Sequence, residues 1–125
     1  MKIISIVGTR PEIIRLSIIF KKLDKFYDHK IIHTGQNFTK ELNEIFFEEL
    51  NLREPDFNLN IVEPNFSSQV GKILKKTEKI LLKEKPDKLL ILGDTNSGLT
   101  SIIAQRLQIP VYHLEAGNRC FDNRV

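Results

Sequence analysis

Short, continuously apolar segments alternate along the chain with longer amphipathic ones. Continuous apolar runs are typical of strands that are covered on both faces of a parallel sheet. The longer segments carry apolar residues at the three- and four-residue spacing of a helix with one buried face. Because the two kinds of segment alternate, the pattern predicts parallel strands joined by right-handed helical crossovers. The expected strands are residues 2–7, 30–34, 57–60, 88–92 and 110–114.

Prolines and short polar residues mark the expected helix boundaries. Pro11 fits the first turn of a helix, where its missing N–H is not needed. Pro86 and Asp87 are expected to end the third helix, since proline cannot continue a helical turn. The expected N-caps of the three later helices are Thr39, then Ser67 or Ser68, then Thr95, Asn96 or Ser97.

The order of the elements predicts one α/β domain, a Rossmann-like open parallel sheet over residues 1–125. The expected strand order is 3-2-1-4-5, which places the first strand beside the fourth. In such sheets ligands bind beyond the carboxyl ends of the strands, where the strand order reverses. Three glycine-containing segments follow predicted strands at that edge, and we expect them to form the site: residues 8–12, 93–97 and 115–119.

Composition and charge exclude several classes of function. The net charge is only +3, whereas a nucleic-acid partner usually selects a clustered basic face. The lysines of residues 72–83 are interpreted as the solvated face of a helix, with a phosphate- or RNA-binding stripe as the alternative. No apolar run approaches the roughly 18 residues of a membrane span. The sequence therefore predicts neither a nucleic-acid nor a membrane partner.

The location predicted from the sequence is cytoplasmic. Residues 1–7 combine a charge with an apolar run, but no small-residue cleavage site follows, which favours a strand over a signal peptide. A single cysteine, Cys120, rules out an internal disulfide within residues 1–125 and fits a reducing compartment. It has no visible base partner for nucleophilic catalysis. No spacing of His, Cys, Asp and Glu resembles a metal site.

Each candidate at the predicted site edge has a structural interpretation beside the functional one. Asp94 is either a site carboxylate or the cap of a helix that begins near Thr95. Arg10 is either a ligand group or a solvated loop arginine. Glu115 directly follows a predicted buried strand, so we expect it near the interior, where a carboxylate needs a partner or a role. Arg119 is the expected partner in a structural ion pair.

His113 lies within the last predicted strand, and we expect it in the core or supporting the site from behind. Function is indicated by the convergence of the three segments more than by any single residue. Neither the phosphate-binding loop of nucleotide triphosphatases nor the glycine fingerprint of dinucleotide-binding proteins is present. ATPase and NAD-dependent dehydrogenase functions are therefore unsupported.

Four motifs occur in a fixed order along nearly the whole chain. They are G-T-R-P-E-I-I-R at residues 8–15, H-T-G-Q-N at 33–37, G-D-T at 93–95 and H-L-E-A-G-N-R at 113–119. Together they resemble the UDP-N-acetylglucosamine 2-epimerase family of the non-hydrolysing type. The resemblance implies one half of a two-domain glycosyltransferase-B architecture with the active site between the domains. This chain would supply the first domain, and the second would lie outside it.

The resemblance also implies a reaction, the C2 epimerisation of a UDP-linked N-acetyl amino sugar. The C2 proton is not next to a carbonyl, so direct deprotonation would leave an unstabilised carbanion. In the family, UDP instead leaves C1 as the C2 proton is lost, which forms a 2-acetamidoglycal. UDP then adds back while a proton reaches the opposite face of C2. Such chemistry needs acid–base groups on both faces of the sugar and charge stabilisation at the leaving group.

We expect Asp94 and Glu115 to be the catalytic carboxylates, and the sequence leaves open which of them moves the C2 proton. Arg10 and Arg15 are expected to neutralise the diphosphate. The resemblance places Gln36 near an effector or sugar site. The remaining expected substrate-binding residues are His113 and Arg119.

Arg15 departs from the family pattern, in which lysine typically stands at this position. Arginine presents a fixed fork and lysine a point charge, so the two are not equivalent. Residues 115–122, together with residues 14–17 and 46–50, resemble more closely the subgroup that makes UDP-N-acetyl-L-fucosamine. The resemblance implies a UDP-sugar substrate, no metal or redox cofactor, a homodimer as is common in such enzymes, and a role in cell-envelope polysaccharide synthesis.

Three other functions remain open at this point. A UDP-sugar-dependent glycosyltransferase of the same architecture would transfer the sugar to an acceptor and never exchange the C2 hydrogen with solvent. A nucleotide-sugar-binding or regulatory module would bind UDP without turnover. A generic α/β interaction domain would need none of the four motifs.

Overall fold

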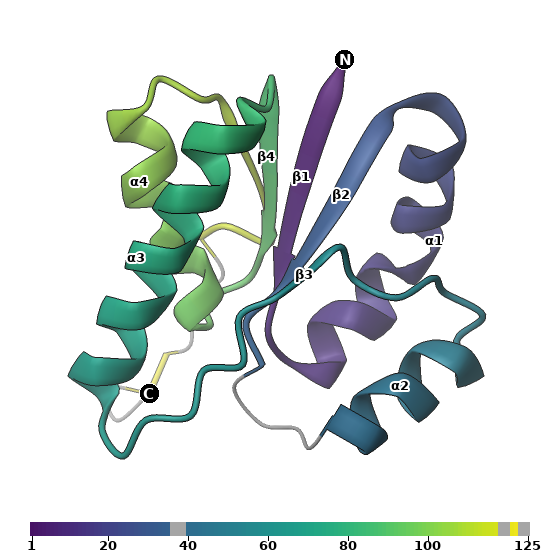
Figure 1. Cartoon of the computed structure of the whole chain (residues 1–125), viewed down its shortest axis with the longest axis horizontal. Helices are drawn as coiled ribbons and strands as arrows, with labels where there is room; N and C mark the ends of the chain where they lie inside the picture. Colours follow the sequence, from purple (N-terminus) through teal and green to yellow (C-terminus); the bar gives the residue numbers. More distant parts are fainter. Residues whose placement is uncertain (36–39, 118–120, 123–125) are drawn as a thin grey trace.

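In the computed structural model, which describes residues 1–35, 40–117 and 121–122, five parallel strands form one sheet (Figure 1). Their order is β3-β2-β1-β4-β5, which confirms the predicted order. The strands are β1 (Lys2–Val7), β2 (Asp28–His33), β3 (Phe57–Asn58), β4 (Lys88–Leu92) and β5 (Val111–Leu114).

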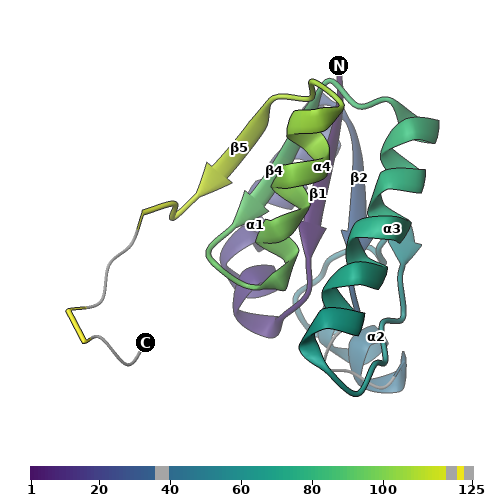
Figure 2. The same ribbon diagram turned by 90° about the vertical axis from the view of Figure 1, so that its left-hand side faces the viewer.

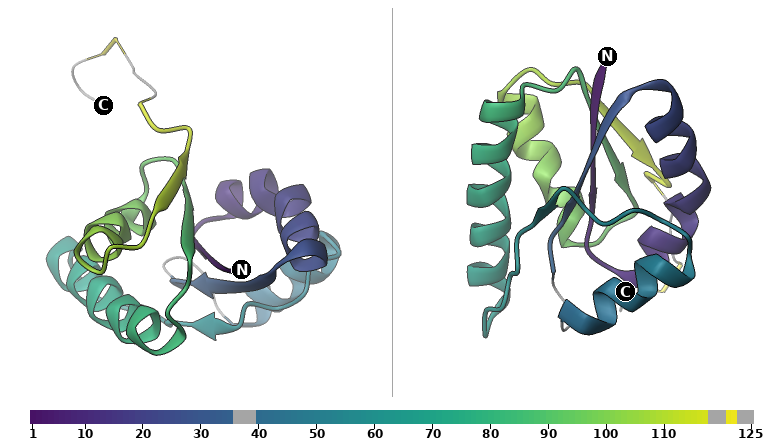
Figure 3. Two further views of the ribbon diagram at one scale, coloured as in Figure 1. Left: turned by 90° about the horizontal axis from the view of Figure 1, so that it is seen from above. Right: turned by 45° about the vertical axis from the view of Figure 1, so that its right-hand side comes forward.

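Helices cover both faces of the sheet (Figure 3). One face carries α1 (Arg10–Phe26) and α2 (Lys40–Glu49). The other carries α3 (Phe66–Glu84), the short 3₁₀ helix η1 (Asn96–Thr100) and α4 (Ser101–Arg106). The edge strand β5 extends beside α4 and away from the centre of the molecule (Figure 2). The predicted open α/β fold class is therefore confirmed.

An apolar core lies on each face of the sheet, and successive residues of the central strands point alternately into one and the other, as the twofold period of a strand requires. Ile4 and Ile6 of β1 belong to the cluster under α3 and α4. Val7 belongs to the cluster under α1 and α2, which also contains the fully buried Phe20 and Phe47. Because both faces of the sheet are covered, the strands read as unbroken apolar runs in the sequence.

Helix α3 begins earlier than predicted. Its N-cap is Asn65, whose Oδ1 accepts a hydrogen bond from Ser68 N at 2.9 Å, so the expected caps Ser67 and Ser68 lie inside the helix instead. Asparagine is as good a cap as serine, and the apolar pattern alone does not separate them. The helix ends where predicted, because Lys85 adopts a left-handed φ of 46° just before Pro86. Thr39 lies outside the described residues.

The predicted fourth helix is divided. Residues after β4 first form η1, and the α-helical hydrogen bonding begins only at Ser101. Thr95 occupies the N-cap position of η1, but its side chain makes no capping hydrogen bond. Its hydroxyl donates instead to Glu12 Oε1 at 2.8 Å.

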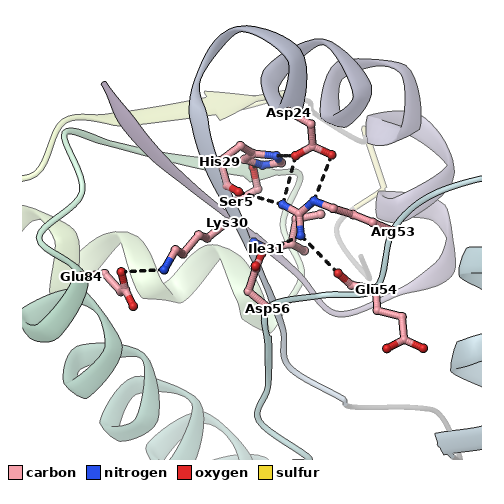
Figure 4. A network of polar contacts seen from close by, with 9 residues as sticks. All are labelled: Ser5, Asp24, His29, Lys30, Ile31, Arg53, Glu54, Asp56 and Glu84. Carbon is pink, nitrogen blue, oxygen red and sulfur yellow. Dashed lines mark hydrogen bonds and ion pairs between the residues drawn. The ribbon is translucent and has the colours of Figure 1, made fainter.

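A polar network beneath α1 fastens the segment before β3 to the sheet (Figure 4). The Arg53 guanidinium donates to both carboxylate oxygens of Asp24, each at 3.0 Å, and to Asp56 Oδ2 at 2.8 Å. His29 donates from Nδ1 to Asp24 at 2.7 Å and accepts from the Ser5 hydroxyl at 2.8 Å. Burial lowers the pKa of His29, and Asp24 partly opposes this effect. The histidine is thus a neutral link in a structural network.

Candidate functional site

A cavity of about 860 Å³ opens at the carboxyl ends of β1, β4 and β5. Its wall combines the turn after β1, the turn after β4 and the segment that follows β5. These are the three segments that the sequence placed at the site edge, as far as the structure describes them. In an open parallel sheet this is where ligands are bound.

Arg15 of α1 and Glu115 both line this cavity and form an ion pair at its wall. Arg15 Nη1 donates to Glu115 Oε2 at 2.6 Å, and the two side chains are 58% and 38% exposed. An ion pair this exposed contributes little stability. The arginine is therefore accessible to an anionic ligand that competes with Glu115 for its donors.

The surroundings of Glu115 correct the sequence-based expectation. Glu115 is exposed and adopts a left-handed φ of 57°, whereas the sequence placed it near the interior. It follows β5, which pairs with β4 alone at the edge of the sheet, so little protein covers it. Its ion-pair partner in the structure is Arg15. The expected partner, Arg119, lies outside the described residues, as does Gln36.

Asp94 is exposed at the cavity wall, directly after Gly93 with its φ of 70°. Within the part of the chain that the structure describes, its carboxylate accepts no hydrogen bond. It does not cap the following helix, because η1 begins two residues later, at Asn96, with Thr95 in the N-cap position. The carboxylate is therefore accessible to a ligand in the cavity.

His113 is exposed and also lines the cavity, so of its two expected places, in the core or supporting the site, the structure excludes the core. The sequence could not show this, because the strand that contains it is an edge strand with an open side. Its Nε2 donates to the Gly93 carbonyl oxygen at 2.5 Å, and Gly93 N donates to Leu114 O at 2.9 Å. These two bonds fasten the turn after β4 to β5.

Arg10 is not part of this cavity wall. It is exposed at the start of α1, with its guanidinium carbon 5.4 Å from the centre of the Phe46 ring of α2. The structure thus brings Arg15, Asp94, His113 and Glu115 together and places Arg10 to one side of them.

Sequence reasoning gave no role to Glu12, although it lines the cavity. The side chain is only 3% exposed and its two oxygens receive four hydrogen bonds, from Gly8 N, Thr9 N, the Thr9 hydroxyl and the Thr95 hydroxyl. The spacing of Thr9 and Glu12 is that of a capping box, a signal that predicts the local bonds but not the distant one.

His33 opens the second sequence motif and is fully buried at the end of β2. Its ring lies 6.1 Å from that of Phe47, edge to face. Burial lowers its pKa from 6.5 to about 4, while a hydrogen bond with Asn58 acts in the opposite direction. Two residues later, Gly35 has a φ of 78°, and a side chain there would lie 3.1 Å from the Asn60 backbone. Of the described residues of this motif, His33 and Thr34 are therefore buried, and Gly35 adopts a backbone conformation that leaves no room for a side chain.

The described residues hold neither a metal-binding cluster nor a membrane-spanning helix. Among residues 1–35, 40–117 and 121–122, no three His, Cys, Asp or Glu side chains come together as a metal ion would require. In the same described part, no helix combines the length and the apolar character needed to cross a bilayer.

These observations define an open α/β protein with a ligand cavity at the reversal of its strand order. A family model described as UDP-N-acetylglucosamine 2-epimerase matches residues 21–125. The chain therefore belongs to the UDP-N-acetylglucosamine 2-epimerase family, as the motifs indicated.

Relatives across bacteria and archaea support this assignment. A UDP-N-acetylglucosamine 2-epimerase of Methanocaldococcus jannaschii is 50% identical over 100% of this chain and 35% of its own length. A UDP-2,3-diacetamido-2,3-dideoxy-D-glucuronate 2-epimerase of Pseudomonas aeruginosa is 40% identical over 100% of this chain and 36% of its own. The chain thus spans about a third of the length of these curated relatives.

Solved structures give the same result. The M. jannaschii UDP-GlcNAc 2-epimerase in complex with UDP-GlcNAc and UDP has a TM-score of 0.90 at 50% identity, over 99% of this chain and 35% of that one. The UDP-N-acetylglucosamine 2-epimerase of Rickettsia bellii has a TM-score of 0.91 at 47% identity, over 100% of this chain and 33% of that one. Such neighbours have the glycosyltransferase-B-like architecture that the sequence analysis expected.

Proposed function

We propose that the protein containing this chain epimerises a UDP-N-acetyl amino sugar at C2, by elimination and re-addition of UDP. The observation that carries the proposal is the convergence of one arginine, Arg15, and two accessible carboxylates, Asp94 and Glu115, on one cavity. Support comes from a relative with 50% identity that was crystallised with UDP-GlcNAc and UDP. The chain corresponds to a third of that relative, and we propose that residues 1–125 form the first domain.

Arg15 is proposed to bind the diphosphate. Its guanidinium is paired with Glu115 at 2.6 Å. A diphosphate carries more charge than one carboxylate and matches the fork of arginine, so it competes effectively for these donors. The exchange would neutralise the leaving group and release Glu115 from its partner in the same step.

Asp94 and Glu115 are proposed as the acid–base pair. In the elimination, the bond between C1 and the UDP oxygen breaks, the C2 proton passes to one carboxylate, and a double bond forms between C1 and C2. In the return step UDP adds to C1 while a proton reaches C2 on the other face. Two carboxylates on different loops, one after β4 and one after β5, are suited to serve the two faces.

UDP-GlcNAc is the first substrate to test, because relatives at 46% and 50% identity are named a UDP-N-acetylglucosamine 2-epimerase homolog and a UDP-N-acetylglucosamine 2-epimerase. The precursor of UDP-N-acetyl-L-fucosamine is the second, because residues 14–17, 46–50 and 115–122 resemble that subgroup. The name of the P. aeruginosa relative, a diacetamido-glucuronate epimerase, illustrates that the family handles different UDP-sugars. Arg10, Gln36, His113 and Arg119 remain proposed substrate-binding residues, and a homodimer remains the proposed assembly.

The test replaces Asp94 in the full-length gene product. Asp94→Asn should abolish loss of the C2 proton signal from the UDP-sugar in D2O while the thermal midpoint stays near that of wild type. The matched control is Asp28→Asn, which removes a 59% exposed carboxylate at the start of β2, at the amino ends of the strands and away from the cavity at their carboxyl ends. Normal turnover of the Asp94 variant would remove Asp94 from the mechanism.

A further inference from the structure

Glu12 is a buried carboxylate with a saturated set of hydrogen bonds. Its Oε2 accepts from Gly8 N at 2.9 Å, from Thr9 N at 2.7 Å and from the Thr9 hydroxyl at 2.9 Å. Its Oε1 accepts from the Thr95 hydroxyl at 2.8 Å. An ionised carboxylate is an acceptor on both oxygens, so it satisfies all four donors.

The four bonds divide into two groups. Three come from residues three or four positions away and form the cap of α1, so they are explained by the helix itself. The fourth joins Glu12 to Thr95, 83 positions later in the chain. The cap does not need this bond. It connects the turn after β1 to the turn after β4, which carries Asp94.

The backbone around Asp94 is held on both sides. On one side Gly93 accepts from His113 Nε2 at 2.5 Å and donates to Leu114 O at 2.9 Å. On the other side the Thr95 side chain is held by Glu12. Within the described residues the Asp94 carboxylate accepts no hydrogen bond of its own, so its direction depends on how its two neighbours are held.

We infer that Glu12 is a positioning residue for the proposed reaction: through the Thr95 hydroxyl it keeps the Asp94 carboxylate aimed into the cavity. The inference rests on the proposed function and adds a residue to it. A reacting group displaced by about 1 Å can cost on the order of a hundredfold in rate, so one anchoring bond can control turnover without touching the substrate. A group held by its neighbours in this way also reaches the transition state without reorganisation.

The test acts on Thr95, because substitution of Glu12 would also remove the cap of α1. In the full-length gene product, Thr95→Val removes the hydroxyl and keeps the shape of the side chain. We expect kcat for C2 exchange to fall at least about tenfold, while KM and the affinity for UDP change less than about threefold. Thr95→Ser keeps the hydroxyl and should restore kcat to within about threefold of wild type.

A double-mutant cycle tests whether Glu12 and Thr95 act as one unit. Glu12→Ala with Thr95→Val should be no slower than Glu12→Ala alone, because both changes break the same connection and the loss of the α1 cap is common to the two proteins compared. The inference is overturned if Thr95→Val keeps wild-type kcat, if Thr95→Ser is as slow as Thr95→Val, or if only KM rises. Wild-type protein without any C2 exchange would instead overturn the proposed function, and this inference with it.

Discussion

Stability should fall between pH 7 and pH 5 because of one buried histidine. His33 is fully buried at the end of β2, and burial lowers its pKa from 6.5 to about 4 in the folded protein. The unfolded chain exposes the ring and returns the pKa to about 6.5. Between these two pKa values the unfolded state therefore binds a proton that the folded state does not bind.

The sign of the effect follows from that difference. A histidine whose pKa is lowered in the folded state costs no stability well above its pKa in the unfolded state. It destabilises the folded protein as the pH falls from the unfolded pKa towards the folded pKa. With a folded pKa of about 4, His33 should cost roughly 2 kcal/mol of unfolding free energy between pH 7 and pH 5. The pKa of His29 is also lowered by burial, so it adds a loss of the same sign.

Urea unfolding of wild type and of His33→Gln at pH 8, 7 and 5 isolates this contribution, because other titrating groups cancel in the comparison. The variant should be less stable at pH 7, since it changes a packed core residue, but should lose roughly 2 kcal/mol less than wild type between pH 7 and pH 5. Between pH 8 and pH 7 the two proteins should change almost equally. Equal losses between pH 7 and pH 5 would refute the reasoning.

Two further predictions concern the fold. Gly35→Ala should destabilise the protein by at least about 2 kcal/mol, because φ is 78° and the new Cβ would lie 3.1 Å from the Asn60 backbone. The control Gly71→Ala, on an open face of α3, should stabilise it by about 0.5–1 kcal/mol, and a similar loss in both variants would contradict the argument. Arg53→Met should cost about 2 kcal/mol by removing the fork to Asp24, with Arg53→Lys between it and wild type in thermal unfolding. Wild-type stability of Arg53→Met would show that the network contributes nothing.

The sheet could be predicted from the sequence because its signal is local. Residues 2–7 and 88–92 are unbroken apolar runs, and parallel strands buried on both faces produce that pattern. The strand order then followed from the alternation of elements. The start of α3 could not be fixed in the same way, because Asn65, Ser67 and Ser68 are all good N-caps and only the hydrogen bond to Ser68 N distinguishes them.

The site could be predicted in its location but not in its internal contacts. Turns that follow parallel strands meet at one edge, so Asp94 and Glu115 were expected together. Exposure depends on the neighbours of a strand, and for this reason Glu115, which follows an edge strand, was wrongly expected inside. His113 lies at the cavity wall, so only the core alternative of its two expected places is excluded. The bond from Thr95 to Glu12 spans 83 positions and has no local pattern that would predict it.

The most direct test of the central claim is proton NMR of the full-length gene product in D2O, first with UDP-GlcNAc and then with the L-talo-configured precursor of UDP-N-acetyl-L-fucosamine. Elimination and re-addition of UDP at this cavity predict loss of the C2 proton signal together with the appearance of a new C2 epimer of one of the two sugars. Tight binding of UDP with no C2 exchange in either sugar would contradict the account and favour a transferase or a binding module.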